Sequence, residues 1–92
     1  MNDFTGKVAA ITGAGSGIGR ALSVELTARG CHIALSDVDE TGMAETVTMA
    51  EQVGSVKIST WVVDVADRDA VEAWAATVVE EHGKVNMIFN NA

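Results

Sequence analysis

Four glycines between Thr12 and Gly19 could hold a phosphate group. The stretch reads T-G-A-G-S-G-I-G, follows an apolar run over residues 7–11 and precedes an apolar-periodic run over residues 20–26. This order predicts a strand, a tight glycine turn and the start of a helix. Unpaired backbone N–H groups and the positive end of the helix dipole would then point at one spot, where an anion binds. A Cβ at the closest glycine would block a pyrophosphate group.

The glycine spacing shows which of the known phosphate-binding motifs the sequence can fit. The common dinucleotide motif G-x-G-x-x-G does not fit, because a frame that starts at Gly13 places Ile18 where the third glycine belongs. The P-loop does not fit either, since no Gly-Lys-Ser/Thr follows. Taken alone, the cluster could also be a plain flexible turn. The spacing that does fit is T-G-x-x-x-G-x-G, with Gly13, Gly17 and Gly19.

Asp37 supplies a carboxylate at the distance that nucleotide binding requires. It ends a second apolar run, over residues 32–36, and lies 18 residues beyond Gly19. A carboxylate at the end of the second strand can hydrogen-bond the ribose hydroxyls of an adenosine, and it would repel a 2′-phosphate there. This favours NAD over NADP. The alternative is that Asp37 caps the turn into the next helix, as Asp39 could.

Two further segments complete a family pattern. Asp64 and Val65 follow a third apolar run over residues 57–63, and the chain closes on Asn-Asn-Ala after a fourth run over residues 85–89. In this order and spacing, the four segments resemble the short-chain dehydrogenase/reductase family, whose members use NAD or NADP. The resemblance spans Thr12 to Ala92, which is nearly the whole chain. It implies a Rossmann-type fold.

The resemblance also implies a role for each matching residue. Asp64 would meet the exocyclic amine of adenine, and Val65 would line the ring. Asn91 would bind the cofactor, Ala92 would line its cleft, and Asn90 would brace the sheet. The residues of the glycine turn would approach the phosphates and the nearby ribose. The predicted cofactor-binding set is Gly13, Gly15, Ser16, Gly17, Ile18, Gly19, Asp37, Asp64, Val65, Asn91 and Ala92.

Two neighbouring positions bear on the choice of cofactor. Val38 follows Asp37, and Ser16 precedes Gly17, at places where NADP-preferring relatives often carry Arg or Lys. The prediction is therefore NAD in preference to NADP. One departure is Asn86, where relatives commonly have Asp. It precedes the fourth strand and should lie far from the nucleotide.

The catalytic residues of the family have no counterpart in the chain. Family members use a Ser, a Tyr and a Lys, the last two as Y-x-x-x-K, but the chain contains no Tyr. We therefore assign no catalytic residue and expect the catalytic residues to lie beyond residue 92. Residues 1–92 are interpreted as an NAD-binding Rossmann segment, truncated before the catalytic half. The substrate pocket and the helices of a dimer or tetramer would also come later.

Three functions are compatible with this pattern to different degrees. The leading hypothesis is an NAD-dependent oxidoreductase that interconverts a small-molecule alcohol and a ketone by hydride transfer, as a homo-oligomer. The alternative is a non-catalytic NAD-binding module, which the absence of Tyr favours for the 92 residues alone. A methyltransferase also carries a carboxylate after strand two, but neither the glycine spacing nor Asn-Asn-Ala suits it.

Composition narrows the partners and the compartment. The formal net charge of −7 and the isoelectric point near 4.5 argue against nucleic acid and anionic membranes as partners. No apolar run approaches the length of a membrane span. Cys31 is the single cysteine, which suits a reducing cytoplasm; we interpret it as a small buried hydrophobe, with a reactive thiol as the alternative. The two histidines have no ligand spacing, so no metal site is predicted.

Apolar runs and helical periodicities alternate, which predicts a parallel α/β sheet. The doubly wound connection rule gives strand order 3-2-1-4, with all four motifs at the carboxyl ends of strands and the fourth strand as a bare edge. The strands should be apolar on both faces. Asp67 should cap the third helix, and each helix should end at a glycine: Gly30, Gly54 and Gly83.

The predicted strands cover residues 7–12, 32–37, 57–63 and 85–90, and the predicted helices cover residues 17–29, 40–52 and 68–82. On the third helix, Trp74, Val78 and Val79 belong to the predicted inward face. Trp61 and Trp74 are interpreted as core residues, with stacking on adenine as the alternative. His82, in the last helical turn, would suit the helix dipole as a cation.

Overall fold

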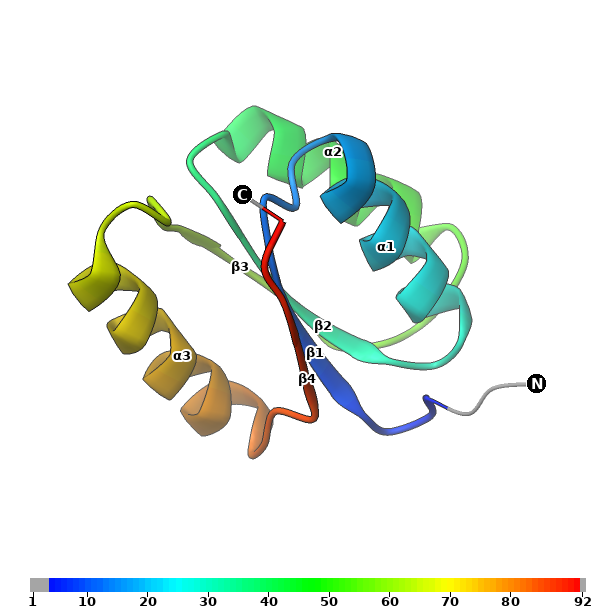
Figure 1. Ribbon diagram of the computed structural model, residues 1–92. Coiled ribbons are helices and arrows are strands. Elements are labelled where there is room, and N and C mark those ends of the chain that lie inside the picture. The colour runs from blue at the N-terminus through cyan, green and yellow to red at the C-terminus, as the bar shows by residue number, and fades with distance from the viewer. Residues whose placement is uncertain (1–3, 92) are drawn as a thin grey trace.

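Strands and helices alternate along residues 4–91, which are the residues that the computed structural model describes (Figure 1). The elements are β1 (Val8–Thr12), α1 (Gly17–Ala28), β2 (His32–Asp37), α2 (Glu40–Glu51), β3 (Ile58–Val62), α3 (Arg68–His82) and β4 (Met87–Phe89). All strand pairs are parallel, and the sheet order is β3-β2-β1-β4. Helices α1 and α2 lie on one face of the sheet and α3 on the other. The predicted doubly wound α/β fold and strand order 3-2-1-4 are confirmed.

Strand β4 is shorter than predicted, because it pairs with β1 only from Met87 to Phe89. Asn86 continues the contact with β1 just before the strand begins. Its backbone N–H donates to the Val8 carbonyl oxygen, and its side-chain Oδ1 accepts a hydrogen bond from the Val8 N–H at 2.9 Å. The side-chain amide of Asn86, at the position where relatives commonly carry Asp, therefore provides a hydrogen-bond partner for the first backbone N–H of β1.

The helix ends follow the glycine prediction at two of three places. Gly30 and Gly83 adopt left-handed φ values of 86° and 81° directly after α1 and α3. Gly54 is different, because α2 ends at Glu51 with a right-handed C-cap at Gln52. A Cβ on Gly54 would lie 2.6 Å from the Thr27 carbonyl oxygen. Gly54 thus permits close packing against α1 and does not terminate α2.

The sheet is buried at its centre and exposed at its edges. Strands β1 and β2 carry the core on both faces, as predicted. The prediction that all four strands are apolar and covered on both faces is wrong for the edge strands, where Val62 is 56% exposed and Ile88 is 67% exposed. Ile88 pairs in register with the buried Ala10, so its exposure marks the part of the sheet that α3 does not reach.

Two clusters of buried side chains fill the layers on either side of the sheet. On the α3 side, Trp74 and Val78 are buried, which confirms core packing for Trp74. Val79 is 48% exposed, so the predicted inward face of α3 is too broad. The reason is that one helix lying alone on a sheet face contacts it through a narrow stripe. The cluster on the α1–α2 side contains Ala9, Ile11, Ala14, Leu26, Cys31, Ile33, Leu35, Met43 and Ala50.

The surroundings of Cys31 and His82, two titratable side chains far from the glycine turn, shift the pKa of each. Cys31 is fully buried, and this burial raises the pKa of its thiol, so the prediction of a small buried hydrophobe is confirmed. His82 lies in the last turn of α3, as expected, but its surroundings oppose a positive charge. Its Nε2 lies 2.6 Å from Ser59 Oγ, and burial lowers the pKa of the imidazole, with Lys57 and His32 adding to the effect and Glu81 opposing it. The cationic form is thus less favoured than in an exposed histidine.

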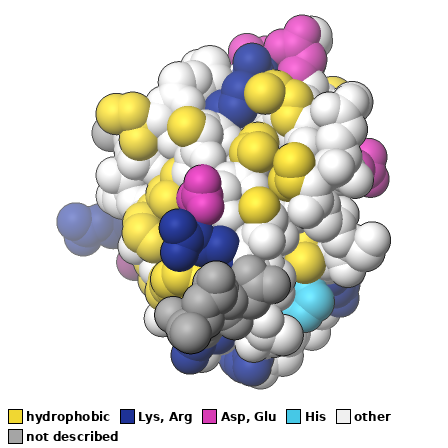
Figure 2. Space-filling view, turned by 90° about the vertical axis from the view of Figure 1, so that its right-hand side faces the viewer, with side chains coloured by type: hydrophobic (Ala, Val, Ile, Leu, Met, Phe, Trp, Pro, Cys, Tyr) yellow, Lys and Arg dark blue, Asp and Glu magenta, His cyan; other side chains and the backbone are white. Residues whose placement is uncertain are grey.

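The surface on the side of the α1–β2 and α2–β3 connections carries hydrophobic, polar and charged side chains (Figure 2). Hydrophobic side chains form separate groups there, between polar atoms and side chains of both charges. Within residues 4–91, no helix has both the length and the apolar character needed to cross a bilayer.

Candidate dinucleotide-binding site

The glycine turn joins β1 to α1 at the carboxyl edge of the sheet. Gly13 and Gly17 have left-handed φ values of 62° and 56°. At Gly17 the backbone conformation alone requires glycine, because a Cβ would meet no atom within 4 Å. At Gly19 the reason is space, since a Cβ there would lie 2.1 Å from the Gly13 carbonyl oxygen. Gly19 therefore lets the backbone of Gly13 pack directly against the start of α1.

Helix α1 begins without a side-chain cap. Ser16 is its N-cap residue, but the Ser16 side chain accepts no hydrogen bond from the helix. The other two helices are capped by aspartates: Asp39 accepts from the Gly42 N–H, and Asp67 accepts from the Ala70 N–H, as predicted for Asp67. The first turn of α1 therefore keeps its N–H groups and its positive dipole end available for an anion.

Asp37 packs directly against the glycine turn. Its Oδ2 accepts a hydrogen bond from the Gly15 N–H at 2.8 Å, and its Oδ1 accepts from the Asp39 N–H at 3.1 Å. Asp39 is the N-cap of α2, and the Asp37 carboxylate closes the turn that precedes it, so the capping alternative accounts for one of its two oxygens and the contact with Gly15 for the other. A Cβ on Gly15 would lie 2.8 Å from Asp37 Oδ2. Glycine at position 15 is thus required for the carboxylate to reach the turn.

The predicted adenine-binding residues lie beside Asp37. Both are exposed, and Asp64 is held in place because its Oδ1 accepts a hydrogen bond from the Ala66 N–H at 2.9 Å. The structure brings the carboxyl ends of β1, β2 and β3 together around a hollow of about 110 Å³, lined by Gly13, Asp37, Val38, Val63, Asp64 and Val65.

The end of β4 is tied to the glycine turn through Thr12. The buried Thr12 hydroxyl donates to Asn90 Oδ1 at 2.9 Å and accepts from the Asn91 N–H at 2.9 Å. This matches the bracing role predicted for Asn90. Asn91 also lies about 3.5 Å from the position of a Cβ on Gly13. Ala92 lies outside the described residues.

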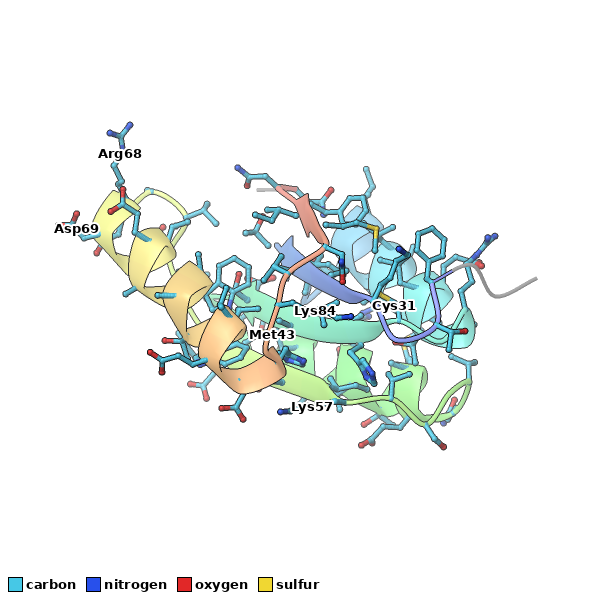
Figure 3. All side chains as sticks on the ribbon, turned by 90° about the horizontal axis from the view of Figure 1, so that it is seen from below. Cys31, Met43, Lys57, Arg68, Asp69 and Lys84 are labelled. Atoms are coloured by element: carbon cyan, nitrogen blue, oxygen red, sulfur yellow. The ribbon has the colours of Figure 1, made fainter. Side chains whose placement is uncertain are left out.

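The electrostatics of the site come from the backbone and from carboxylates. Arg68, at the start of α3 (Figure 3), lines a hollow of about 210 Å³ together with Thr12, Val65 and Asn90. The Arg20 guanidinium lies behind the turn and donates to the Gly15 carbonyl oxygen. An anion at the glycine turn would meet neutral backbone N–H donors, with the carboxylates of Asp37 and Asp64 beside them. Within residues 4–91, no group of three or more His, Cys, Asp or Glu side chains could hold a metal ion.

Three residues of this arrangement were missed by the sequence analysis. The glycine motif includes Thr12 but assigns it no role of its own, and its place directly before Gly13 is the one signal that the sequence offers. Arg20 and Thr46 belong to polar positions of two helices, where a solvent-exposed side chain is the usual interpretation. Arg20 contacts the Gly15 carbonyl oxygen and Thr46 contacts the Ala14 carbonyl oxygen, and both contacts depend on how α1 packs against α2.

Comparison with known proteins agrees with this geometry. The sequence profile of the short chain dehydrogenase family matches residues 7–92. The chain belongs to the short-chain dehydrogenase family. This membership rules out the methyltransferase interpretation and confirms the resemblance on which the sequence analysis relied.

Individual relatives share both sequence and fold with this short-chain dehydrogenase chain. It is 50% identical over 92 residues to SadH of Mycobacterium tuberculosis, covering all of the chain and 33% of SadH. It is 40% identical over 90 residues to levodione reductase of Leifsonia aquatica, covering 97% of the chain and 34% of that enzyme. The crystal structure of NAD⁺-bound xylitol dehydrogenase superimposes with a TM-score of 0.92 at 36% identity, covering 98% of the chain and 34% of that structure.

Two facts follow from these comparisons. NAD is a cofactor used within the family, since a solved relative carries it. The chain spans about a third of the length of the relatives that it matches.

Proposed function

We propose that the chain binds NAD at the glycine turn and forms the nucleotide-binding part of an oxidoreductase that interconverts an alcohol and a ketone. The observation that carries this proposal is the uncapped start of α1 beside an aspartate held at the end of β2. Two other helices of the same chain are capped by aspartates, so the missing cap is specific to the turn that would face the pyrophosphate. When bound, NAD would supply the hydride acceptor.

Each part of the dinucleotide would have a counterpart among the residues of the candidate site. The turn from Gly13 to Gly19, with Ser16 and Ile18 exposed at its surface, would hold the pyrophosphate and the nearby ribose through backbone N–H groups. Asp37 would accept hydrogen bonds from the adenosine ribose hydroxyls. Asp64 and Val65 would border the adenine, and Asn91 with Ala92 would line the cleft toward the nicotinamide.

A preference for NAD over NADP is part of the proposal. The Asp37 carboxylate already accepts N–H groups from Gly15 and Asp39, so it is fixed in place where a 2′-phosphate would have to lie. Repulsion between the two negative groups would disfavour NADP. Val38, which is 63% exposed beside Asp37, offers no positive charge to offset this repulsion.

Titration of the chain with NAD⁺ and NADP⁺ by calorimetry tests both parts of the proposal. We expect NAD⁺ to bind at least about tenfold more tightly, a difference of about 1.4 kcal/mol. Asp37→Ala should narrow that ratio to within about threefold. Asp69→Ala is the matched control, because Asp69 is an exposed aspartate that points outward from α3 (Figure 3). A selectivity that is unchanged in Asp37→Ala would refute the assigned role, and no binding of either nucleotide would refute the function.

The activity itself depends on residues that the chain does not contain, since it has no Tyr. The second candidate, a non-catalytic NAD-binding module, is favoured by that same observation. Two observations distinguish the oxidoreductase from the non-catalytic module. One is whether a Y-x-x-x-K sequence follows residue 92 in the open reading frame, and the other is the intact mass of the natural polypeptide. A mass near 9.6 kDa would favour the module.

We further propose that the whole enzyme acts on a small-molecule alcohol or ketone, in the cytoplasm and as a homo-oligomer. The buried free thiol of Cys31 supports a reducing compartment. The exposed Ile88 on edge strand β4 supports further covering of the sheet. Light scattering of the natural polypeptide would test the oligomeric state, and a monomer would refute it.

A further inference from the structure

Arg20 connects the glycine turn to α2. It lies in the first turn of α1, and its side chain is 26% exposed. Its Nη2 donates to the Gly15 carbonyl oxygen at 2.7 Å, to the Gly42 carbonyl oxygen at 3.1 Å and to Glu45 Oε1 at 3.0 Å. Its Nε donates to Thr46 Oγ1 at 3.0 Å. One guanidinium thus contacts the turn and three positions of α2.

Thr46 holds the adjacent peptide of the same turn. Its side chain is fully buried, and its hydroxyl lies 2.7 Å from the Ala14 carbonyl oxygen and 3.1 Å from that of Gly42. The carbonyl groups of two consecutive residues are therefore both anchored: that of Ala14 directly to Thr46 of α2, and that of Gly15 to Arg20 of α1, whose guanidinium contacts α2. Neither contact reaches the side of the turn where an anion would bind.

These anchors decide where the N–H groups of the turn point. In a trans peptide the C=O and the following N–H point in opposite directions. With the Ala14 carbonyl held toward Thr46, the Gly15 N–H points the other way, to Asp37 Oδ2. With the Gly15 carbonyl held toward Arg20, the Ser16 N–H points away from α2, toward the outer side of the turn.

We propose that Arg20 and Thr46 are positioning residues for the dinucleotide site. They hold two carbonyl oxygens behind the turn, so that its N–H groups face the pyrophosphate and Asp37. If the anchors were lost, the glycine-rich backbone could rotate and turn a carbonyl oxygen toward the phosphate, which would repel it. This inference rests on the proposed function, and it makes Arg20 act through the backbone without touching the phosphate.

The simpler interpretation is that Arg20 forms a surface ion pair with Glu45. The Glu45 side chain is 63% exposed, and pairs of this kind contribute little. The two interpretations predict different effects of lysine. A lysine could restore a single ion pair, but a compact ammonium group cannot reproduce the separate Nε and Nη2 contacts of a planar guanidinium.

Calorimetric titrations with NAD⁺ and with adenosine separate these interpretations. Adenosine has no phosphate, so it reports on Asp37 and Asp64 without the pyrophosphate contacts. We expect Arg20→Met to weaken NAD⁺ binding at least about tenfold and adenosine binding less than about threefold. Arg20→Lys should not restore NAD⁺ binding. Glu45→Gln should leave both affinities within about twofold, because it removes the ion pair alone.

Two matched variants guard against a general loss of structure. Arg29→Met removes the arginine at the C-cap of α1, whose Nε pairs with Glu25, and should change neither affinity. Thr46→Ser keeps the hydroxyl and should bind NAD⁺ like the wild type, whereas Thr46→Val should weaken NAD⁺ as Arg20→Met does. Circular dichroism of every variant checks that the chain is folded. Equal weakening of NAD⁺ and adenosine in Arg20→Met, or full rescue by lysine, would overturn the proposal.

A measurement without any nucleotide keeps this inference separate from the proposed function. Because Asp37 accepts the Gly15 N–H in the anchored turn, Arg20→Met and Thr46→Val should speed hydrogen exchange of the Gly15 amide at least about tenfold, as followed by NMR. Exchange that stays at the wild-type rate would overturn the positioning role. Failure of the wild type to bind NAD⁺ or adenosine would instead overturn the proposed function.

Discussion

Replacing Gly19 by alanine should damage nucleotide binding much more than folding. The added Cβ would lie 2.1 Å from the Gly13 carbonyl oxygen, 2.7 Å from the Gly13 carbonyl carbon and 3.0 Å from Ala14 Cα. Every one of these atoms belongs to the backbone, so no side-chain rotamer can relieve the contact. The glycine turn would have to retreat by at least about 1.3 Å to reach an ordinary van der Waals distance.

The expected magnitudes follow from this displacement. Alanine gains about 1 kcal/mol over glycine inside a helix, while overpacking costs about 1–3 kcal/mol, so the net loss of folding free energy should be about 0–2 kcal/mol. A displacement of this size takes an N–H group out of hydrogen-bond range of a phosphate oxygen. Losing one such charge-assisted bond costs about 1.5–3 kcal/mol, which is about a 10- to 150-fold rise in the dissociation constant of NAD⁺.

Calorimetric titration with NAD⁺ and urea unfolding together test this reasoning. Gly83→Ala is the control, because Gly83 has a left-handed φ of 81° and a Cβ there would meet no atom within 4 Å. It should lower the free energy of unfolding by about 1–2 kcal/mol and leave NAD⁺ binding unchanged. A folded Gly19→Ala chain that binds NAD⁺ within twofold of the wild type would refute the argument.

Two further predictions concern the sheet and its pH dependence. Thr12→Val removes a buried hydroxyl that joins β1 to the end of β4, and should lower the free energy of unfolding, measured in urea, by about 1–3 kcal/mol. The control is Thr77→Val on α3, which should lower it by no more than about 0.5 kcal/mol. Equal losses would contradict the bracing role. Because burial lowers the pKa of His82 below its ordinary 6.5, the unfolded chain binds more protons, and stability should fall as the pH drops from about 6.5 through the lower folded pKa. His82→Gln should flatten that decline in urea titrations repeated between about pH 7 and pH 5; an unchanged decline would show that other groups cause it.

Much of the fold was predictable because it depends on local chemistry. Left-handed glycines end α1 and α3, and Asp67 caps α3, since these features depend on a few adjacent residues. The strand order followed from the handedness of parallel crossovers, which is a general property of L-amino acid chains. The meeting of Gly13, Asp37 and Asp64 at one edge of the sheet was predictable for the same reason, because the carboxyl ends of parallel strands share that edge.

The remaining errors arose where burial depends on neighbours that are distant in sequence. Apolar content made β3 and β4 look covered, but Val62 and Ile88 are exposed because each lies on an edge strand of the sheet, where neighbouring elements cover less of the surface. Position in the last turn of α3 suggested a charged His82, but contact with Ser59 on β3 and partial burial favour the neutral ring.

The amino-acid sequence by itself determined the glycine turn, the carboxylate after β2 and the parallel order of the strands. The tertiary structure alone decided what holds these parts together: the Gly15 N–H on Asp37, the Thr12 hydroxyl on the end of β4, and Arg20 against α2. A pattern of residue types specifies which backbone conformations are allowed. The direction in which a polar side chain finds its partner depends on how whole elements pack, because that packing sets the distances between residues far apart in the chain.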